Sequence, residues 1–348
     1  MRVVVVGASG NVGTSLLRSL AAEPAVESVL GVARRLPRAE FAKTEWAAAD
    51  VSRDELVPLF RGADCVVHLA WLIQPSRDPQ HMRHTNVLGS RRVFRAVVDA
   101  GVPSLVYASS VGAYSAGPKD RLVDESWPVD GIETNTYARH KAAVERELDL
   151  LELERPELRV VRMRPAFILK RAAGAGVRRL FLGPFVPSPL VRPALIRVVP
   201  EHPRFRFQAL HSHDAGEAYR LAIVGEARGA FNLAADPVLD GPELGRILGA
   251  RPVRVGHRPF RAFVDATWRL RLQPVDGSWV DLAYGAPLLD AARARDELGW
   301  EPTWSADRAL LDQIGGIADS AGLETPPLSP DSDRLEEIAT GVGGSERL

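Results

Sequence analysis

Over about the first 165 residues, short apolar runs alternate with longer amphipathic stretches. The runs are rich in β-branched residues and have the length of buried strands; they are Val3–Val6, Ser28–Ala33, Cys65–Leu69, Ser104–Ala108 and Arg159–Met163. The stretches between them repeat with the period of a helix, at Asn11–Ala22, Asp54–Phe60, Asn86–Ala100 and Tyr137–Glu154. Strands that alternate with helices predict an α/β fold, a doubly wound parallel sheet with helices on both faces.

The pattern changes after about Lys170. Residues 171–204 are rich in proline, arginine and large apolar side chains and show no clear period. Helices are predicted near 214–225, 259–270 and 290–298, and a strand near 230–235. From residue 323 the composition turns to Pro, Ser, Asp, Glu and Gly, which predicts a poorly ordered tail over 323–348. We expect a first domain over 1–170 and a smaller region over 171–322, whose strand near 230–235 returns to the main sheet.

Three glycines follow the first predicted strand directly. Gly7, Gly10 and Gly13 have the spacing G-x-x-G-x-x-G and lead into a segment with helical period. Glycine allows a tight turn and a close backbone approach to a pyrophosphate, and the helix start offers unpaired N–H groups to that anion. A glycine triplet alone is a weak signal, but its place between strand and helix makes it specific. We therefore predict a Rossmann-type dinucleotide-binding domain over 1–170 and a substrate-binding region over 171–322.

The end of the second predicted strand bears on which dinucleotide binds. Proteins that bind NAD usually carry an acidic residue about 20 residues past the glycines, where it accepts a hydrogen bond from the ribose 2′-hydroxyl. Here Ala33 stands near that place, and Arg34 and Arg35 follow it. Arginine complements a 2′-phosphate. The sequence favours NADP, with NAD as the alternative.

A tyrosine and a lysine four residues apart supply candidate chemistry. Tyr137 and Lys141 share one face of a predicted helix, and Ser110 follows the predicted strand Ser104–Ala108. A lysine near a phenol favours the phenolate and lowers its pKa. A tuned phenol can exchange a proton with a carbonyl oxygen during hydride transfer, and Ser110 is placed to hydrogen-bond that oxygen. We expect these three side chains to be the catalytic residues.

Several ordered motifs together resemble the extended short-chain dehydrogenase/reductase family, the NAD-dependent epimerase/dehydratase group. The matching pieces are GASGNVG at 7–13, VVHLA at 66–70, TNVLGS at 85–90, YASSVGAY at 107–114, YARHK at 137–141, RP at 164–165, HSHD at 211–214 and ELGWEP at 297–302. The resemblance covers about residues 1–320. It implies a homodimer formed through the helices at about 86–100 and 137–154, and a small-molecule substrate.

The resemblance also implies a role for each matching residue. Tyr137 is the expected acid/base, Lys141 its tuner and ribose ligand, and Ser110 the partner of the substrate oxygen. The other expected cofactor contacts are Gly7, Gly10, Asn11, Val12 and Gly13 along the pyrophosphate, Asp50 and Val51 at the adenine, Leu69 and Ala70 along the cofactor path, Asn86 behind the site, and Pro165, Ala166 and Phe167 near the nicotinamide.

Some positions depart from the family pattern. Val111 and Gly112 stand where sugar-nucleotide dehydratases place an Asp-Glu pair, which argues against elimination of water. Ala33 weakens the epimerase interpretation, and Lys170 stands where a glycine is expected. We favour an NAD(P)-dependent reductase or dehydrogenase. The alternatives are a nucleotide-sugar epimerase with tightly bound NAD and a non-catalytic NADP(H)-binding sensor.

The substrate side is less defined by the sequence. Candidates for substrate contact are Trp71, Tyr114, Glu125, Arg178 and Arg179. Residues 171–204 combine arginines that suit a diphosphate with side chains that suit an apolar pocket, and simple packing of a lid remains an equal alternative. His211 and His213 lack a convincing third ligand, so we expect no metal site, and Asp214 is the expected N-cap of the helix that follows.

Composition narrows the partners. Lysine plus arginine and aspartate plus glutamate number 44 each, so the formal net charge is zero, which gives no general reason to expect nucleic acid or an anionic membrane as partner. The single cysteine, Cys65, cannot form an internal disulfide. No apolar run approaches the 20 or so residues of a membrane span. We expect a cytoplasmic protein with no membrane partner.

Overall fold

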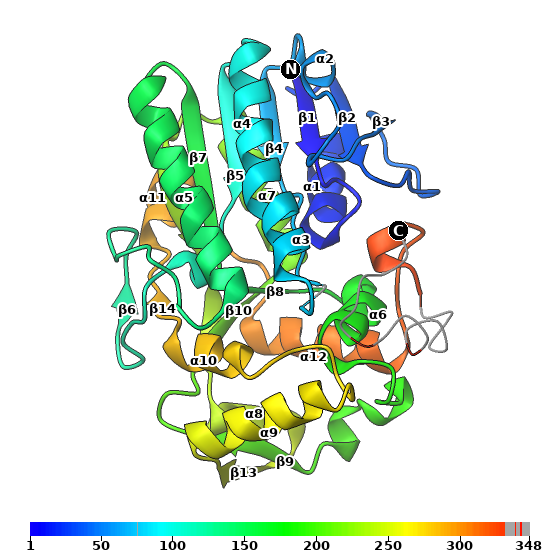
Figure 1. Cartoon of the computed structure of the whole chain (residues 1–348), viewed down its shortest axis with the longest axis vertical. Helices are drawn as coiled ribbons and strands as arrows, with labels where there is room; N and C mark the ends of the chain where they lie inside the picture. Colours follow the sequence, from blue (N-terminus) through cyan, green and yellow to red (C-terminus); the bar gives the residue numbers. More distant parts are fainter. Residues whose placement is uncertain (75, 331–337, 339–341, 343–348) are drawn as a thin grey trace.

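A seven-stranded parallel sheet forms the centre of the computed structural model, which describes residues 1–74, 76–330, 338 and 342. Its strands are β1 (Arg2–Val6), β2 (Ser28–Ala33), β3 (Thr44–Ala48), β4 (Cys65–His68), β5 (Ser104–Ala108), β7 (Arg159–Pro165) and β11 (Gly229–Leu233). They lie in the order β11-β7-β5-β4-β1-β2-β3 (Figure 1). The strand order turns between β1 and β4, as in doubly wound sheets. The predicted fold class is confirmed, and β11 is the strand expected near 230–235.

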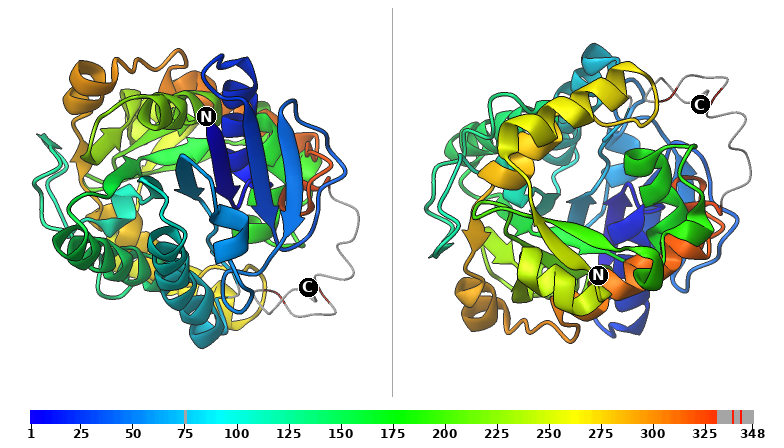
Figure 2. Two further views of the ribbon diagram at one scale, coloured as in Figure 1. Left: turned by 90° about the horizontal axis from the view of Figure 1, so that it is seen from above. Right: turned by 90° about the horizontal axis from the view of Figure 1, so that it is seen from below.

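Helices cover both faces of this sheet (Figure 2). On one face lie α1 (Asn11–Ala22), α7 (Ser212–Val224) and α11 (Ala292–Leu298); on the other lie α2 (Val57–Phe60), α4 (Gly89–Asp99) and α5 (Thr136–Glu154). The alternating valines of β1 divide between two cores. Val3 and Val5 pack with Leu16 of α1, whereas Val4 and Val6 pack with residues of α4 and α5. This two-sided burial explains the continuous apolar run in the sequence.

The rest of the chain lies beyond the carboxyl ends of the strands (Figure 1). A small sheet joins β8 (Phe167–Leu169), β10 (Phe207–His211) and β12 (Ala235–Leu239); β9 (Val198–Glu201) pairs with β13 (Arg251–Arg254), and β6 (Leu122–Val123) pairs with β14 (Leu288–Leu289). The helices of this part are α6 (Gly174–Val177), α8 (Gly241–Leu248), α9 (His257–Arg269), α10 (Ser278–Gly285) and α12 (Ala306–Ala318), while α3 (Pro79–Arg83) precedes α4.

The sequence did not predict several of these elements. The strand β3 lies at the sheet edge with half-exposed residues on both faces, so it lacks an apolar run. Predicted helix ends also differ from the observed ones: α2 begins at Val57 rather than at residue 54, and α4 begins at Gly89 after a π-helical turn, His84–Leu88. The short strands β8, β9 and β13 lie in the stretches where proline and arginine interrupt any period.

The first residues of the predicted poorly ordered tail are packed against the rest of the protein. Residues 323–330 are packed rather than free, with a 3₁₀ turn at Pro326–Leu328 and only 4% of Leu328 exposed. The backbone N–H groups of Arg38 and Ala39 donate to the carbonyl of Glu324, which ties the segment to the loop after β2. Composition did not report these contacts because they are made to a distant part of the chain. Most of residues 331–348 lie outside the described residues, so there the prediction stays untested.

Two surface properties bear on partners. None of the helices within the described residues is both long enough and apolar enough to cross a bilayer. The helices α4 and α5 lie side by side on one face (Figure 1), where Arg91 of α4 forms an ion pair with Glu147 of α5. Pairing of two copies through these helices stays a prediction.

Candidate active site

The glycine turn lines one side of a cavity at the carboxyl edge of the sheet. Gly7 has φ +87°, and a β-carbon there would lie 2.6 Å from the backbone nitrogen of Ala70. A β-carbon on Gly13 would lie 2.4 Å from the carbonyl oxygen of Ala8. Both positions therefore require glycine. Helix α1 starts at Gly10 without a side-chain cap and has no acidic residue in its first turn, so its first N–H groups stay available for an anion.

The cavity extends from this turn across the ends of β2 and β4. It encloses about 160 Å³, and its lining residues are Val6, Gly7, Ser9, Gly10, Val32, Ala33, Arg34, Ala49, Val51, Leu69, Ala70, Trp71, Leu72, Thr85 and Pro327. The sequence predicted Gly7, Gly10, Arg34, Val51, Leu69 and Ala70 as cofactor contacts, and the cavity brings these together. The sequence did not predict three other lining residues, Ser9, Thr85 and Pro327. Ser9 lies within the glycine motif, whereas nothing in the sequence connects Pro327 to it.

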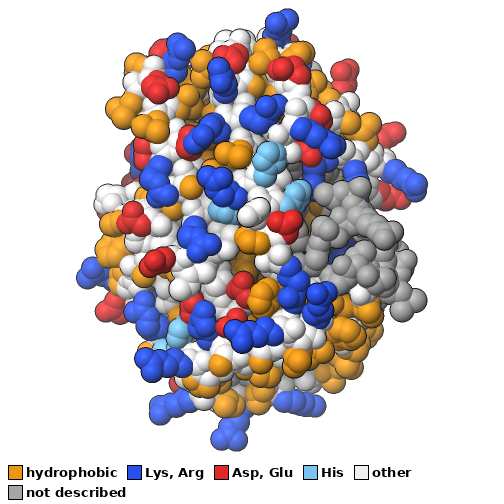
Figure 3. Space-filling model, in the orientation of Figure 1, with side chains coloured by type: hydrophobic (Ala, Val, Ile, Leu, Met, Phe, Trp, Pro, Cys, Tyr) orange, Lys and Arg blue, Asp and Glu red, His pale blue; other side chains and the backbone are white. Residues whose placement is uncertain are grey.

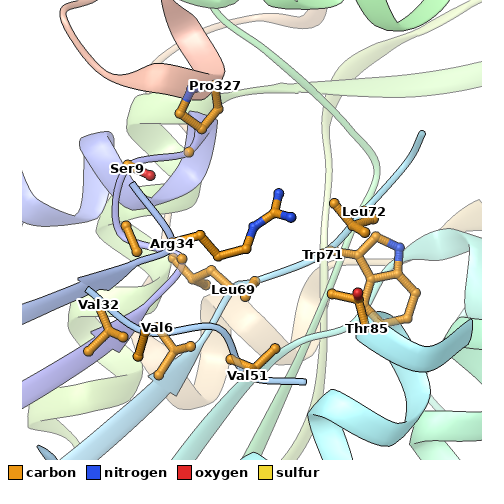
Figure 4. Close-up of a pocket in the computed structure, with 15 residues that line it drawn as sticks. Val6, Ser9, Val32, Arg34, Val51, Leu69, Trp71, Leu72, Thr85 and Pro327 are labelled. Atoms are coloured by element: carbon orange, nitrogen blue, oxygen red, sulfur yellow. The ribbon is translucent and has the colours of Figure 1, made fainter. Parts of the chain in front are cut away.

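Arg34 reaches into this cavity. In Figure 4 its guanidinium points toward the open space between Ser9 and Leu72, with Val51 beneath. Asp50 lies near Arg34: burial raises the pKa of this carboxyl, but its hydrogen bonds from Ser52 and the charge of Arg34 outweigh burial, and the net pKa is lowered. Arg35 is exposed and does not line the cavity, so of the two predicted arginines only Arg34 is placed to meet a bound group.

The three predicted catalytic side chains meet at the carboxyl edge of β5. Ser110 follows β5, and its Oγ accepts a hydrogen bond from the N–H of Gly112. The side chain of Tyr137, at the start of α5, hydrogen-bonds Ser110. Lys141 lies one helical turn on, with its ammonium donating to the carbonyl of Ala108 at 2.6 Å. The arrangement joins a phenol, a hydroxyl and a cation beside the cavity of the glycine turn.

Burial dominates the proton affinities of this group. It raises the pKa of Tyr137 to about 12, against a lowering effect of the Ser110 hydrogen bond. It lowers the pKa of Lys141 to about 7, although the charge of Glu145 acts the other way. The predicted lowering of the tyrosine pKa by Lys141 is thus not seen in this arrangement. The ammonium of Lys141 lies 5.8 Å from the centroid of the Tyr137 ring and 3.6 Å from that of the Trp71 ring. Of these two rings, Trp71 is therefore the closer to the ammonium.

Aromatic side chains surround the phenol. The ring centroids of Trp71 and Trp279 lie 6.0 and 5.6 Å from that of Tyr137. Phe181 lies 5.1 Å from Trp279, at a right angle to it. Trp71 was a predicted substrate contact, and Phe181 is one of the large apolar side chains of 171–204 that suited an apolar pocket. Trp279 of α10 was not predicted. Ala166 belongs to the same apolar cluster as Tyr137, while Phe167 turns away to pack on Phe207.

Tyr114 packs in the same apolar cluster as Tyr137 and Trp279, but its hydroxyl group and the Glu125 carboxylate are bonded to protein partners. Tyr114 is fully buried, donates to Asn232 and accepts from Arg164. A carboxylate oxygen of Glu125 accepts from the N–H of Asn232. These hydrogen bonds join β7 and β11 to the loops after β5. Contact of Tyr114 and Glu125 with substrate stays a prediction.

The residues behind the site hold it in place. Asn86 is fully buried and exchanges two hydrogen bonds with the backbone of Leu72, which fixes the loop that carries Trp71. Glu145 of α5 is buried beneath Ser110, where it accepts from Ser109 and forms ion pairs with Arg162 and Arg164 of β7. Sequence reasoning missed this carboxylate; its only signal was its place two turns beyond Tyr137.

Lys170 is a second residue that the sequence left unexplained. Its ammonium, buried beside α1, donates to the hydroxyls of Thr14 at 2.8 Å and Ser15 at 3.0 Å. It also donates to the carbonyl of Asn11. The side-chain nitrogen of Asn11 donates to the carbonyl of Ile168, and its buried Oδ1 has no hydrogen-bond partner among the described residues. Val12 and Gly13 do not line the cavity and instead pack α1 on the sheet. A lysine thus lies behind the helix start that faces the cavity.

The side chains of the remaining candidates bond to other parts of the protein. Arg178 is fully buried and donates to the carbonyl of Gly183, and Arg179 donates to carbonyls of the 326–329 turn. His211 rather than Asp214 caps α7, because its ring accepts from the N–H of His213. Asp214 instead accepts from Thr303 and Trp304. In the part of the chain that the structure describes, no three potential ligands cluster as a metal site.

Comparisons with known proteins agree with this architecture. Residues 3–169 match the model of the NAD dependent epimerase/dehydratase family. An uncharacterized protein of Mycobacterium tuberculosis is 28% identical over 374 aligned positions, covering 99% of this chain and 90% of that protein. Sterol demethylase protein B of Methylococcus capsulatus is 31% identical over 156 residues, covering 43% of this chain and 47% of the relative.

A solved structure extends the likeness over most of the chain. The UDP-glucuronic acid 4-epimerase of Bacillus cereus, in complex with UDP-4-deoxy-4-fluoro-glucuronic acid and NAD, has a TM-score of 0.67 at 15% identity. The match covers 92% of this chain and 99% of that chain. At this identity the likeness establishes the fold.

Proposed function

We infer the function from the family to which residues 3–169 belong, the NAD dependent epimerase/dehydratase family, and from the group of Tyr137, Ser110 and Lys141. The protein is an oxidoreductase that transfers hydride between a nicotinamide dinucleotide and a carbonyl or alcohol carbon. The observation that carries this proposal is the meeting of phenol, hydroxyl and ammonium beside the cavity of the glycine turn.

The dinucleotide, when bound along Gly7, Gly10 and the start of α1, supplies or accepts the hydride. Tyr137 holds its proton at neutral pH because burial raises its pKa to about 12, so it is a proton donor to a substrate oxygen during reduction. Ser110 already hydrogen-bonds Tyr137 and can bind the same oxygen. Lys141, anchored on Ala108, places its amino group next to the phenol, and this group is charged below its lowered pKa of about 7.

The walls around Tyr137 support an apolar substrate. Trp71, Trp279 and Phe181 surround the phenol, and no arginine takes part in these ring contacts. Arg178 and Arg179, which the sequence offered as diphosphate ligands, bond to backbone carbonyls. A ketone or alcohol on an apolar molecule is therefore the substrate class of this proposal. The partial similarity to a protein named sterol demethylase protein B supports the same class.

Replacement of Tyr137 by phenylalanine tests the reaction. The variant should lose about 10²–10⁴-fold in kcat, because only the transferable proton is removed. The assay is oxidation of NADPH and of NADH with a panel of apolar ketones. Tyr284→Phe is the matched control, since its hydroxyl is buried without a partner among the described residues. Full activity of Tyr137→Phe would refute the acid/base role, and dinucleotide binding without turnover of any substrate would favour a sensor.

The cofactor of this proposal is NADP. Arg34 lines the cavity beside Ala33, where an NAD-binding protein usually carries a carboxylate. Ala33→Asp should reverse the preference, because an introduced carboxylate accepts from a 2′-hydroxyl and repels a 2′-phosphate. The measurement is the Kd of NADPH and NADH for both proteins. A wild-type chain that binds NADH more tightly, with no change in the variant, would contradict the assignment.

A nucleotide-sugar epimerase is the second candidate, favoured by the fold shared with the Bacillus cereus enzyme. An epimerase of this kind re-reduces its own product and so keeps its cofactor. Purification without added nucleotide, denaturation and mass spectrometry of the released nucleotide separate the two. Near-stoichiometric NAD would favour the epimerase, whereas NADP or substoichiometric nucleotide would favour an exchangeable cosubstrate.

A further inference from the structure

One end of the molecule carries an unusual share of exposed apolar side chains. Residues 178–200 and 251–272 form this end, which we name the basic apolar face. Among the described residues fifteen large hydrophobic side chains are exposed, and eight lie in these two segments: Phe185, Leu190, Leu195, Val198, Val253, Phe263, Leu270 and Leu272. Figure 2 shows this end from below, with α9 along one side, and orange and blue side chains follow the lower edge of Figure 3.

The helix α9 exposes mainly apolar side chains to solvent, which is unusual for a surface helix. It has no buried residue along its 13 positions. Its exposed residues are Arg258, Pro259, Ala262, Phe263, Ala266 and Arg269. Apart from the two arginines, the outward side is therefore entirely apolar, whereas a solvated helix normally turns polar residues outward. The inward side is fixed to the body, where Trp268 donates to Ser76 and stacks with Arg77.

The strands β9 and β13 extend this surface. They pair in parallel with Val198 opposite Arg251 and Pro200 opposite Val253. Paired residues of a parallel ladder point to the same side, as do residues two apart. Val198 is 60% and Val253 is 41% exposed, so the outer side of this ribbon is also apolar and carries Arg251.

The charge of this face is strongly positive. The two segments contain ten arginines and one acidic residue, Asp265, a formal charge of +9 in a chain whose net charge is zero. Seven of the arginines are exposed: Arg192, Arg197, Arg251, Arg254, Arg258, Arg269 and Arg271. Arg192 lies 3.8 Å from Asp319, and none of the other six forms an ion pair with a described residue. The zero net charge, from which we expected no membrane partner, hides this asymmetry.

We propose that the basic apolar face docks the protein on an anionic lipid bilayer. Arginines beside exposed phenylalanine and leucine match an interface with anionic headgroups above acyl chains. A second copy of the chain would bring two positive faces together, and nucleic acid would leave Phe263 and Leu270 in water. The segment 178–200 also reaches the candidate active site, because its Phe181 contacts Trp279 beside Tyr137.

Vesicle flotation with the full chain tests the docking. Phosphatidylcholine vesicles with phosphatidylglycerol should carry the protein upward, vesicles of phosphatidylcholine alone should carry much less, and added salt should reduce the difference. Replacing Arg258 and Arg269 by serine should weaken partitioning by about tenfold or more. Replacing Phe263 and Leu270 by serine should weaken it similarly, since both side chains would leave the acyl region.

Matched substitutions control for charge and hydrophobicity elsewhere. Arg95→Ser on α4 and Leu153→Ser on α5 change exposed side chains outside the face and should leave partitioning unchanged. Melting temperatures of all variants check that each is folded. Failure to float with anionic vesicles, or equal flotation of the face variants and the wild type, would overturn the proposal. Because no substrate is used, the result is independent of the proposed reaction.

Discussion

Lys170 shows how one side chain can couple the fold to the cofactor site. Its ammonium is 5% exposed and is surrounded by the hydroxyls of Thr14 and Ser15 and the carbonyl of Asn11. No carboxylate of the described residues pairs with it. Burial, with a contribution from the charge of Arg18, lowers its pKa from 10.5 to about 7. The cation lies behind the start of α1, where a positive charge adds to the pull of the helix on an anion.

Replacement of Lys170 by methionine should therefore have a pH-dependent effect. Below pH 7 the lysine is charged in both states and the folded protein bears the full cost of the buried charge; between pH 7 and 10.5 only the unfolded chain keeps the proton, so this cost falls as pH rises. The melting temperature of Lys170→Met relative to wild type should be highest near about pH 6 and decline toward about pH 9. A pH-independent difference would show that the lysine is not titrating there.

The Lys170→Met variant should also show how much the charge of Lys170 contributes to the affinity for the cofactor. Wild-type affinity for NADPH should decrease as pH rises through about 7, because the ammonium loses its charge. The variant should lack this part of the decrease. Lys141 titrates in a similar range in both proteins, so the comparison isolates Lys170. Isothermal titration calorimetry at several pH values measures the Kd of NADPH for both proteins.

At the scale of elements, a buried ion-pair network joins α5 to β7. Glu145 is 1% exposed and accepts from Arg164 at 2.8 and 2.9 Å and from Arg162 at 3.0 Å. Burial opposes ionisation of this carboxyl, but the hydrogen bonds and charge of Arg164, with the charge of Arg162, hold its pKa at about 2. The network fixes the position of α5 along its axis relative to β5 and β7, and with it the position of Tyr137.

Glu145→Gln should destabilise the protein strongly. It leaves two buried arginines without their shared carboxylate, at a cost of about 3–5 kcal/mol in the free energy of unfolding. Urea unfolding near neutral pH measures it. The stabilisation is present above pH 4.5 and is lost as pH falls toward 2, so wild type and variant should converge in acid. Glu147→Gln, two residues along and paired with Arg91 at the surface, should cost less than about 1 kcal/mol. Equal losses would contradict the network.

At the scale of the whole molecule, the turn Pro326–Leu328 near the C-terminus helps to line the cavity of the glycine turn near the N-terminus. Pro327 lies beside Ser9 in Figure 4, more than 300 residues away in sequence. Arg179 holds this turn by donating to the carbonyls of Pro327 and Ser329. The proposed dinucleotide-binding cavity is thus lined in part by a segment outside the family match to residues 3–169.

A chain that ends at Gly322 should bind NADPH about tenfold more weakly than the full chain, as expected for loss of one apolar contact of about 1.5 kcal/mol. A chain that ends at Pro330 keeps the turn and should bind like the full chain. Pro327→Ala provides a point variant should the truncated chain prove unstable, with a smaller loss in the same direction. Unchanged affinity in both shortened chains would show that the turn does not contribute.

The amino-acid sequence by itself determined the layered architecture and the glycine turn, and it pointed to the candidate catalytic residues. The apolar run of β1, the glycines at 7, 10 and 13, and Tyr137 with Lys141 on one helix face all depend on interactions within a few residues, which periodicity and spacing report directly. Tertiary structure decided what depends on distant packing. It joined Tyr114 and Glu125 to Asn232, placed Lys170 behind α1 and Pro327 at the cavity, and gathered seven exposed arginines on one face of a neutral chain. Such contacts leave no local pattern, because each partner is chosen by how the elements pack.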